Sequence, residues 1–160
     1  MKRKIYSAAA LLLLVCMLCA CSSGKSAKTP EMQAVADAVG ASIDISDMSQ
    51  IPDEYVENIM GIALDGYVSR NTLMSAVGTN INEYGIFLAK DADQAKTIKD
   101  ALNAYLEYRE SVWMDEYLPD EKPKLDNAEV WQQGNYVMYT ILSDADRDAV
   151  NAAFEGCFEG

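Results

Sequence analysis

The sequence contains no histidine and few basic residues among its 160 amino acids. Without an imidazole, neither a Ser-His-Asp nor a Cys-His catalytic arrangement can form, and histidine-ligated metal centres are excluded as well. The chain has 13 Lys and Arg against 25 Asp and Glu, which gives a formal charge of −12. This balance argues against a nucleic-acid partner, because phosphate contacts need a basic face. The sequence also indicates no cofactor.

Long hydrophobic runs are absent except at the N-terminus. Lys2, Arg3 and Lys4 form a positive start, and an apolar stretch of 16 residues interrupted only by Ser7 follows at positions 5–20. This stretch is shorter than the roughly 20 residues that span a bilayer as a stable helix. A charged start, a short apolar run and then small polar residues are typical of a secretory signal peptide.

The end of this leader carries a more specific pattern. Residues 18–21 are Leu-Cys-Ala-Cys, which resembles the lipobox of bacterial lipoproteins. The resemblance implies that Cys21 receives a diacylglyceryl group and becomes the first residue of the mature protein. Cys19 is a rival position, but the bulky Leu18 precedes it where a small residue is needed. The alternative is an ordinary signal peptide whose cysteines are incidental.

Processing at Cys21 divides the chain into three parts: a lipoprotein signal peptide at 1–20, a lipidated cysteine with a flexible tether at 21–30, and a single domain at 31–160. The tether is small and polar, as expected of a random coil. The mature chain would hold 10 basic and 25 acidic residues, a formal charge of −15, with Cys157 as its one remaining thiol. Such a domain must be stable on its core alone, which its length permits.

Hydrophobic spacing and turn residues predict an α+β fold. Two N-terminal helices are expected, one from Thr29 or Pro30 to Val39 and one from Pro52 to Gly61, separated by a polar stretch at 44–50. Two β-hairpins should join as one antiparallel sheet, each followed by a helix. The expected hairpin strands are 68–77 with 84–89 and 130–132 with 136–142, and a loop containing Pro119 and Pro123 lies between the hairpins.

The helix after the first hairpin is the clearest element of the pattern. Asp91 is an N-cap, Gln94 completes a capping box, and a long apolar stripe with helical spacing follows it. Ser143 similarly caps the last helix, which places Val150, Phe154 and Cys157 on one apolar face. The stripe of the long helix consists of Ala95, Ile98, Leu102, Tyr105, Leu106, Val112 and Trp113.

Several short motifs follow one another along the chain: Asn82-Glu83-Tyr84-Gly85-Ile86-Phe87, a helix rich in Ala, Tyr and Arg, Tyr117-Leu118-Pro119, Asp126-Asn127-Ala128 and Gly134-Asn135-Tyr136-Val137. Taken in this order, they resemble a family of short Firmicutes-type lipoproteins that carry a domain of unknown function. The similarity spans about residues 52–154, and it supports location and fold but implies no activity or cofactor. Residues 60–63 are similar to the family's usual Tyr-Gly-Ile-Asp but depart from it at both ends.

Two groups of side chains are candidate binding sites. Trp113, Tyr117, Trp131 and Tyr136, together with Tyr139, could form an aromatic platform for a sugar or a peptide, although packing between the long helix and the sheet explains them better. The second group is Asp144, Asp146, Asp148 and Glu155, which match positions 1, 3, 5 and 12 of a calcium-binding loop. Ala149 occupies the position where that loop needs glycine, so a helix with acids in its first turn is the preferred interpretation.

These observations lead to a functional hypothesis. We expect a lipoprotein anchored to the outer face of the cell membrane through the lipid on Cys21, with a small acidic, non-enzymatic domain that binds an unidentified cell-envelope protein or ligand. One alternative is a small cell-envelope hydrolase that uses two carboxylates facing a cleft. A ligand-capturing protein that serves a transporter ranks last, because the domain is too small for two lobes.

Overall fold

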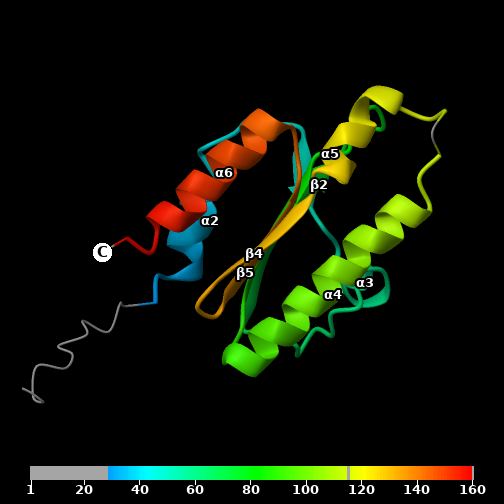
Figure 1. Cartoon of the computed structure of the whole chain (residues 1–160). Coiled ribbons are helices and arrows are strands. Elements are labelled where there is room, and N and C mark those ends of the chain that lie inside the picture. Colours follow the sequence, from blue (N-terminus) through cyan, green and yellow to red (C-terminus); the bar gives the residue numbers. More distant parts are fainter. Residues whose placement is uncertain (1–28, 115, 160) are drawn as a thin grey trace, which may run out of the picture.

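The computed structural model describes residues 29–114 and 116–159, which form an α+β structure around one five-stranded antiparallel sheet (Figure 1). Helices cover both faces of this sheet, and the predicted fold class is confirmed. The elements in chain order are α2 (Met32–Gly40), β1 (Met48–Gln50), α3 (Asp53–Asn58), β2 (Ser69–Ser75), β3 (Glu83–Leu88), α4 (Ala92–Ser111), a 3-10 helix (Pro119–Glu121), α5 (Lys122–Asp126), β4 (Glu129–Gln133), β5 (Tyr136–Ile141) and α6 (Asp144–Gly156).

The two predicted hairpins, β2–β3 and β4–β5, are confirmed, and they join through β3 and β5. The strand order is β1-β2-β3-β5-β4, with every neighbouring pair antiparallel. In the central pair, Glu83 lies opposite Ile141 and Leu88 opposite Tyr136. The second hairpin turns through Gly134, whose φ of 57° is a conformation that glycine adopts without strain.

Strand β1 was not expected, since residues 44–50 were predicted to be a polar connection. It pairs with β2, and the flanking backbone adds hydrogen bonds from Ala76 N–H to the Asp47 carbonyl and from Ile51 N–H to the Thr72 carbonyl. Two of its three side chains are exposed. Such a short polar strand lacks the alternation of apolar and polar residues by which strands are predicted. It becomes a strand because its backbone pairs with the edge of β2.

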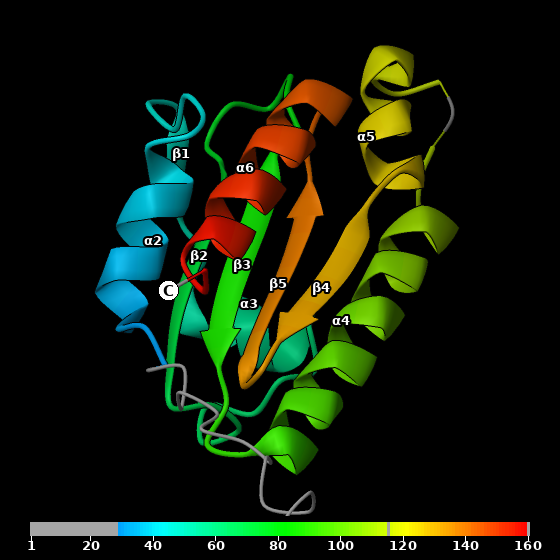
Figure 2. The same ribbon diagram turned by 60° about the vertical axis from the view of Figure 1, so that its left-hand side comes forward.

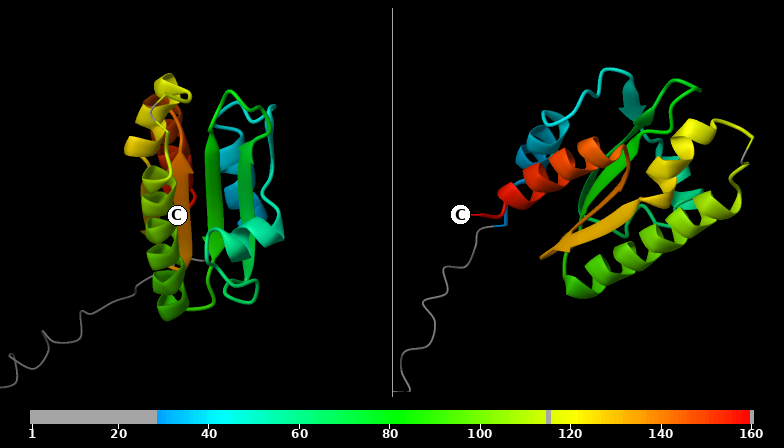
Figure 3. Two further views of the ribbon diagram at one scale, coloured as in Figure 1. Left: turned by 90° about the vertical axis from the view of Figure 1, so that its right-hand side faces the viewer. Right: turned by 45° about the horizontal axis from the view of Figure 1, so that its top comes forward.

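The sheet separates two hydrophobic cores. Side chains of β3 and β5 point alternately to the two faces, so Phe87, Val137 and Tyr139 pack under α3, α4 and α5, whereas Tyr84, Ile86 and Tyr136 pack under α2 and α6. Figure 2 shows α2 and α6 over one face, and the right-hand view in Figure 3 shows the sheet between the two helical layers. The central strands are therefore buried on both sides.

Helix α4 begins where its capping residues predicted. The Asp91 side chain accepts a hydrogen bond from Gln94 N–H at 2.8 Å, and the Gln94 side chain in turn accepts one from Lys90 N–H at 2.8 Å. The predicted stripe is buried from Ala95 to Leu106. The prediction was wrong at the far end, because the helix ends at Ser111 and Val112 is exposed.

The segment that contains Pro119 and Pro123 is helical rather than a loop, which corrects the prediction. Each proline lies in the first turn of a short helix, where its missing N–H removes no helical hydrogen bond and its fixed φ suits the helix. Leu125 is fully buried in the core under α4. This long-range contact holds the helical segment in place.

Gly85, in the middle of β3, allows a close approach between neighbouring strands. A Cβ atom placed on it would lie 2.5 Å from the Tyr139 ring and 2.9 Å from the Thr72 side chain. Gly85 and Tyr139 are directly opposite each other, so the ring of Tyr139 lies over the glycine. A strand glycine commonly marks such a contact.

We predict that Gly85→Ala lowers the free energy of unfolding by about 1–3 kcal/mol, because the added methyl group overpacks the strand against the Tyr139 ring. Urea denaturation measures the change. Gly78→Ala is the matched control, since a Cβ atom there has no atom within 4 Å and should leave stability within about 0.5 kcal/mol. Equal stability of both variants would contradict the close contact.

Candidate functional site

A buried carboxylate lies at the start of β3. Glu83 is 1% exposed and faces the layer of α3 and α4. Its Oε1 atom accepts hydrogen bonds from the hydroxyl groups of Tyr105 at 2.7 Å and Tyr139 at 2.6 Å, and its Oε2 atom accepts one from Arg109 Nη1 at 2.7 Å. A buried charge requires this kind of compensation, because its desolvation is unfavourable.

Secondary structure explains why these groups meet. Tyr105 and Arg109 are four residues apart on α4 and so lie on the same face of the helix. Their side chains also contact each other, with Arg109 Nη1 2.5 Å from the Tyr105 hydroxyl. Tyr139 reaches Glu83 diagonally across Gly85, a neighbour relation that antiparallel strands provide. The Tyr55 hydroxyl, 3.0 Å from that of Tyr105, brings α3 into the same network.

The surroundings of Tyr105, Tyr139 and Arg109 raise the pKa of each of these three groups. Burial, followed by the charge of Glu83, raises the pKa of Tyr105 and of Tyr139, so both phenols stay protonated and donate. Burial disfavours the Arg109 cation, but the charge of Glu83 outweighs this effect and raises the pKa of Arg109. With both oxygens occupied by fixed donors, Glu83 is suited to holding the fold together rather than to transferring protons.

A second polar contact fastens the segment after α4 to the β2–β3 loop. Glu121 Oε2 accepts hydrogen bonds from Ile81 N–H at 3.0 Å and from Lys124 Nζ at 2.8 Å, and Lys124 also donates to Asn82 Oδ1 at 2.9 Å. Burial acts against the charged form, but these donors lower the pKa of Glu121. The loop, α5 and the start of β3 therefore form one fixed end of the molecule.

A small cavity of about 110 Å³ opens at this end of the sheet. Glu83 and Arg109 form part of its wall, and the strand ends and the loop supply the rest. Its volume is well below the 300–1,000 Å³ that is usual for small-molecule sites. The other lining residues are Met74, Ser75, Asn80, Ile81 and Asn82.

Large apolar side chains are exposed around the same end. The Tyr117 hydroxyl donates to the Gly78 carbonyl at 3.0 Å, which brings the segment after α4 against the β2–β3 loop. Exposed apolar residues that gather in this way mark interaction sites more often than scattered ones do. We call this set the Tyr117 surface, and it comprises Val77, Tyr108, Val112, Met114 and Tyr117.

Acidic side chains surround the Tyr117 surface. Glu107 and Glu110 flank Tyr108 on α4, and Glu116 and Asp120 flank Tyr117. All four are exposed, and within residues 29–114 and 116–159 none of them pairs with Lys or Arg. The Tyr117 surface thus combines exposed apolar side chains with unpaired acidic neighbours in the chain.

The chain enters the domain at the opposite end of the sheet. The Pro30 carbonyl accepts a hydrogen bond from the Tyr136 hydroxyl at 2.7 Å, and Tyr136 is opposite the last residue of β3. Glu83 is the first residue of that strand, so the two points are about 17 Å apart at the usual rise of about 3.4 Å per residue. Figure 1 shows the start of α2 and helix α5 at opposite ends of the domain.

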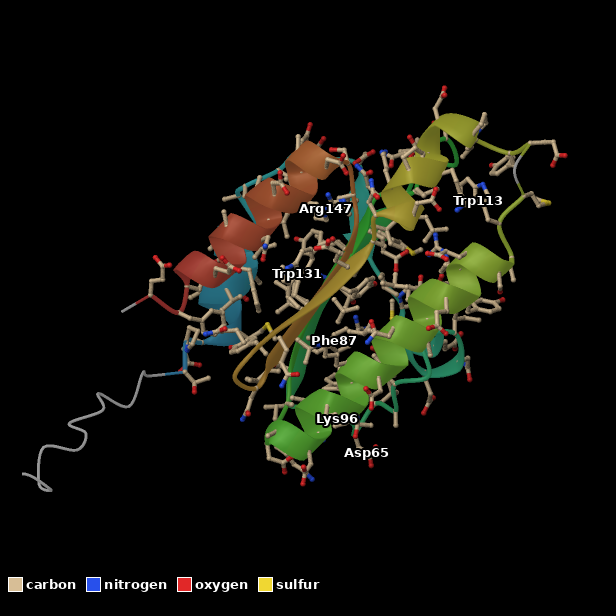
Figure 4. The ribbon with its side chains drawn as sticks, in the orientation of Figure 1. Asp65, Phe87, Lys96, Trp113, Trp131 and Arg147 are labelled. Atoms are coloured by element: carbon tan, nitrogen blue, oxygen red, sulfur yellow. The ribbon has the colours of Figure 1, made fainter. Side chains whose placement is uncertain are left out.

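The structure does not gather the predicted aromatic residues into one platform. Trp113 and Tyr117 lie at the end of α4, whereas Trp131 packs on the opposite face of the sheet beneath α6 (Figure 4). Tyr136 is fully buried on that opposite face, and Tyr139 belongs to the Glu83 network. Of the predicted set, Tyr117 is the residue with an exposed ring.

The acidic residues near the C-terminus lie in α6, and the predicted Ser143 cap is confirmed. Ser143 Oγ accepts a hydrogen bond from Asp146 N–H, and Asp144 pairs with Arg147 at 3.0 Å. With the helix beginning at Asp144, residues 144–155 cannot wrap around an ion as a calcium-binding loop does. In the part of the chain that is described, no three His, Cys, Asp or Glu side chains form a metal-ligating group.

Two cysteines bear on the predictions from the sequence, Cys157 and Cys21. Cys157 is partly buried beside the α2–α6 core, and this burial raises the pKa of its thiol. Cys21 lies outside the described residues, as do the leader and most of the tether. Within the described ranges, no helix is both long and apolar enough to span a bilayer.

Sequence reasoning missed the Glu83 network. Two signals for it are visible afterwards, because Glu83 begins an otherwise apolar β-run and Arg109 continues the buried spacing of Tyr105 by one helical turn. Neither signal is specific, since 25 acids offer many partners. The pairing requires strand β3 and helix α4 to be placed next to each other.

Taken together, the fold and this site define a small single-sheet α+β domain held by a buried ion pair. A family model described as a domain of unknown function, DUF4358, matches residues 41–142. The chain therefore belongs to the DUF4358 family, and the matched range includes Glu83, Tyr105, Arg109 and Tyr139. Comparisons with curated proteins and with solved structures gave no match.

We predict that Arg109→Met lowers the free energy of unfolding by about 3–5 kcal/mol, because Glu83 stays buried without its cation. Adding Glu83→Gln should recover much of this loss, since the neutral amide oxygen still accepts from both tyrosines. Urea denaturation of the single and double variants measures the coupling. Purely additive losses would show that the two side chains do not depend on each other.

Proposed function

We propose that this protein is a lipoprotein, anchored to the outer face of the cell membrane, whose domain binds a partner protein without catalysing a reaction. The observation that carries the anchoring is the Leu-Cys-Ala-Cys sequence at 18–21 after a short apolar leader. Each buried methylene of an acyl chain contributes about 0.8 kcal/mol, and two chains give a stable hold where one is marginal. The lipid on Cys21 would thus keep the domain at the membrane.

The position of the chain's entry supports an orientation for the anchored domain. Pro30 is fixed to Tyr136 at one end of the sheet, and the Tyr117 surface lies at the other end. A domain tethered through residues 21–30 would therefore present the Tyr117 surface away from the lipid. Its formal charge of −15 also opposes close contact with anionic head groups.

The Tyr117 surface is the docking site that we propose for the partner. Its centre is formed by Val112, Met114 and Tyr117, and the unpaired acids around it favour a partner with basic residues at its rim. The ion pairs beneath it, Glu83–Arg109 and Glu121–Lys124, hold this surface in one shape. Preformed surfaces lose less entropy on binding. We infer an envelope protein with an apolar patch and a basic rim.

The geometry favours binding over the hydrolase alternative. Asp91 and Asp93 line one open cavity of about 400 Å³, but Asp91 is the N-cap of α4 and accepts the Gln94 N–H. Glu83 has both of its oxygens occupied by donors. A carboxylate acting as nucleophile or general acid must instead face the substrate with an oxygen free.

We predict that mass spectrometry of the membrane-extracted protein finds Cys21 as its first residue with a diacylglyceryl group attached. Cys21→Ser should abolish lipidation and release the chain from the membrane fraction, because no thiol remains at that position. Cys157→Ser is the control and should stay in the membrane. An intact leader or an unmodified Cys21 in the native product would overturn the anchoring.

We predict that Met114→Glu reduces capture of one specific partner by crosslinking in intact cells by about 30-fold, as expected when a central interface residue contributes about 2 kcal/mol. Met114 is 65% exposed, so the fold should be unaffected. Val68→Glu is the matched control, because it adds the same charge at a residue 61% exposed at the far end of β3. Equal loss in both variants, or repeated recovery of the domain alone, would contradict the docking site.

A further inference from the structure

A second cavity, of about 560 Å³, lies on the opposite face of the sheet from Glu83. It is bounded by one side of α2 from Gln33 to Gly40 and by strands β1, β2 and β3, which Figure 2 shows beside one another. The volume falls within the range of small-molecule sites. The lining residues are Gln33, Ala36, Asp37, Gly40, Ala41, Ile45, Met48, Gln50, Asn71, Leu73 and Tyr84.

Two polar atoms in this cavity have no partner. Tyr84 is 1% exposed, and its hydroxyl makes no hydrogen bond within residues 29–114 and 116–159. It points at the end of α2, since a Cβ atom on Gly40 would lie 3.5 Å from it. The Oδ1 atom of Asn71 is also buried without a partner. Buried polar groups are nearly always hydrogen-bonded, so the buried Asn71 Oδ1 atom indicates an absent partner, and the Tyr84 hydroxyl offers a second contact at the cavity wall.

Three side chains of the cavity offer acceptors for hydrogen bonds, beside the amides of Gln33 and Gln50. Asn71 Oδ1 and the Asp37 carboxylate accept, and the Tyr84 hydroxyl can do so too. Neither Lys nor Arg lines the cavity, and Asp37 is contacted by the Gln33 amide at 2.7 Å rather than by a cation. The remaining wall is aliphatic, with Ile45, Met48 and Leu73. A ligand that combines several donors with an apolar body matches these acceptors and this wall.

We propose that this cavity binds a small aliphatic amine, whose ammonium group donates to Asp37, Asn71 and Tyr84 while its methylene chain packs on Ile45, Met48 and Leu73. An ammonium has three donors and no acceptor, which matches the unpartnered oxygens. The acidic domain attracts such cations to its surface. This site is separate from the Tyr117 surface and does not depend on the proposed partner.

Calorimetric titration of the purified mature protein with 1,5-diaminopentane tests the proposal, with 1,5-pentanediol as the neutral analogue of equal length. We expect saturable 1:1 binding of the diamine and none of the diol. Asp37→Asn should weaken binding by about tenfold or more, and Tyr84→Phe by several-fold, because charge-assisted hydrogen bonds are lost. Urea denaturation confirms that each variant is folded.

Asp65→Asn is the matched control, because Asp65 is an exposed acid on a loop away from the cavity (Figure 4). It should bind the diamine as the unaltered protein does. Three results would overturn the proposal: no saturable binding of the diamine, equal weakening by Asp65→Asn and Asp37→Asn, or equal affinity for the diol. The second result would mean that amines are attracted only by the overall charge.

Discussion

The buried ion pair between Glu83 and Arg109 is the interaction on which the arrangement of this domain depends. It joins the start of the central strand β3 to the last turn of α4, and Tyr139 and Tyr55 extend it to β5 and α3. Both oxygens of the buried Glu83 carboxylate accept hydrogen bonds, which is the condition for a buried charge to be tolerated. Because the partners come from four elements, the network is complete only when all of them are in place.

The network also determines which side chains remain free at the surface. It leaves the Glu83 carboxylate without a free oxygen, while the segment after α4 remains at the surface with its apolar side chains exposed. Glu121 and Lys124 fix that segment to the β2–β3 loop. The ion pairs Glu83–Arg109 and Glu121–Lys124 thus hold in place the segments that carry the Tyr117 surface, in line with the proposed binding role. The cavity on the other face is lined by polar side chains and by aliphatic groups.

Much of the fold could be predicted from local chemistry. Asp91 with Gln94 and Ser143 with Asp146 locate two helix starts, because a cap satisfies N–H groups within a few residues. The two β-hairpins were recognisable from turn residues between apolar runs. The predictions failed at β1 and at the two short helices that contain Pro119 and Pro123. Strand β1, with the sequence Met-Ser-Gln, forms because it pairs with β2, and α5 is held by the burial of Leu125 in the core. Both depend on residues that are distant in the chain.

By itself, the sequence determined the leader pattern ending at Cys21, the acidic charge, the lack of histidine chemistry and the order of helices and hairpins. These follow from composition and from contacts between residues close in the chain. Only the tertiary structure decided which acid is buried, since Glu83 meets Arg109 26 residues away and Tyr139 56 residues away. It also separated Tyr117 from Trp131 and Tyr136, and placed Tyr84 and Asn71 in one cavity. Strand register and helix docking set these relations, because they bring together side chains that no local pattern connects.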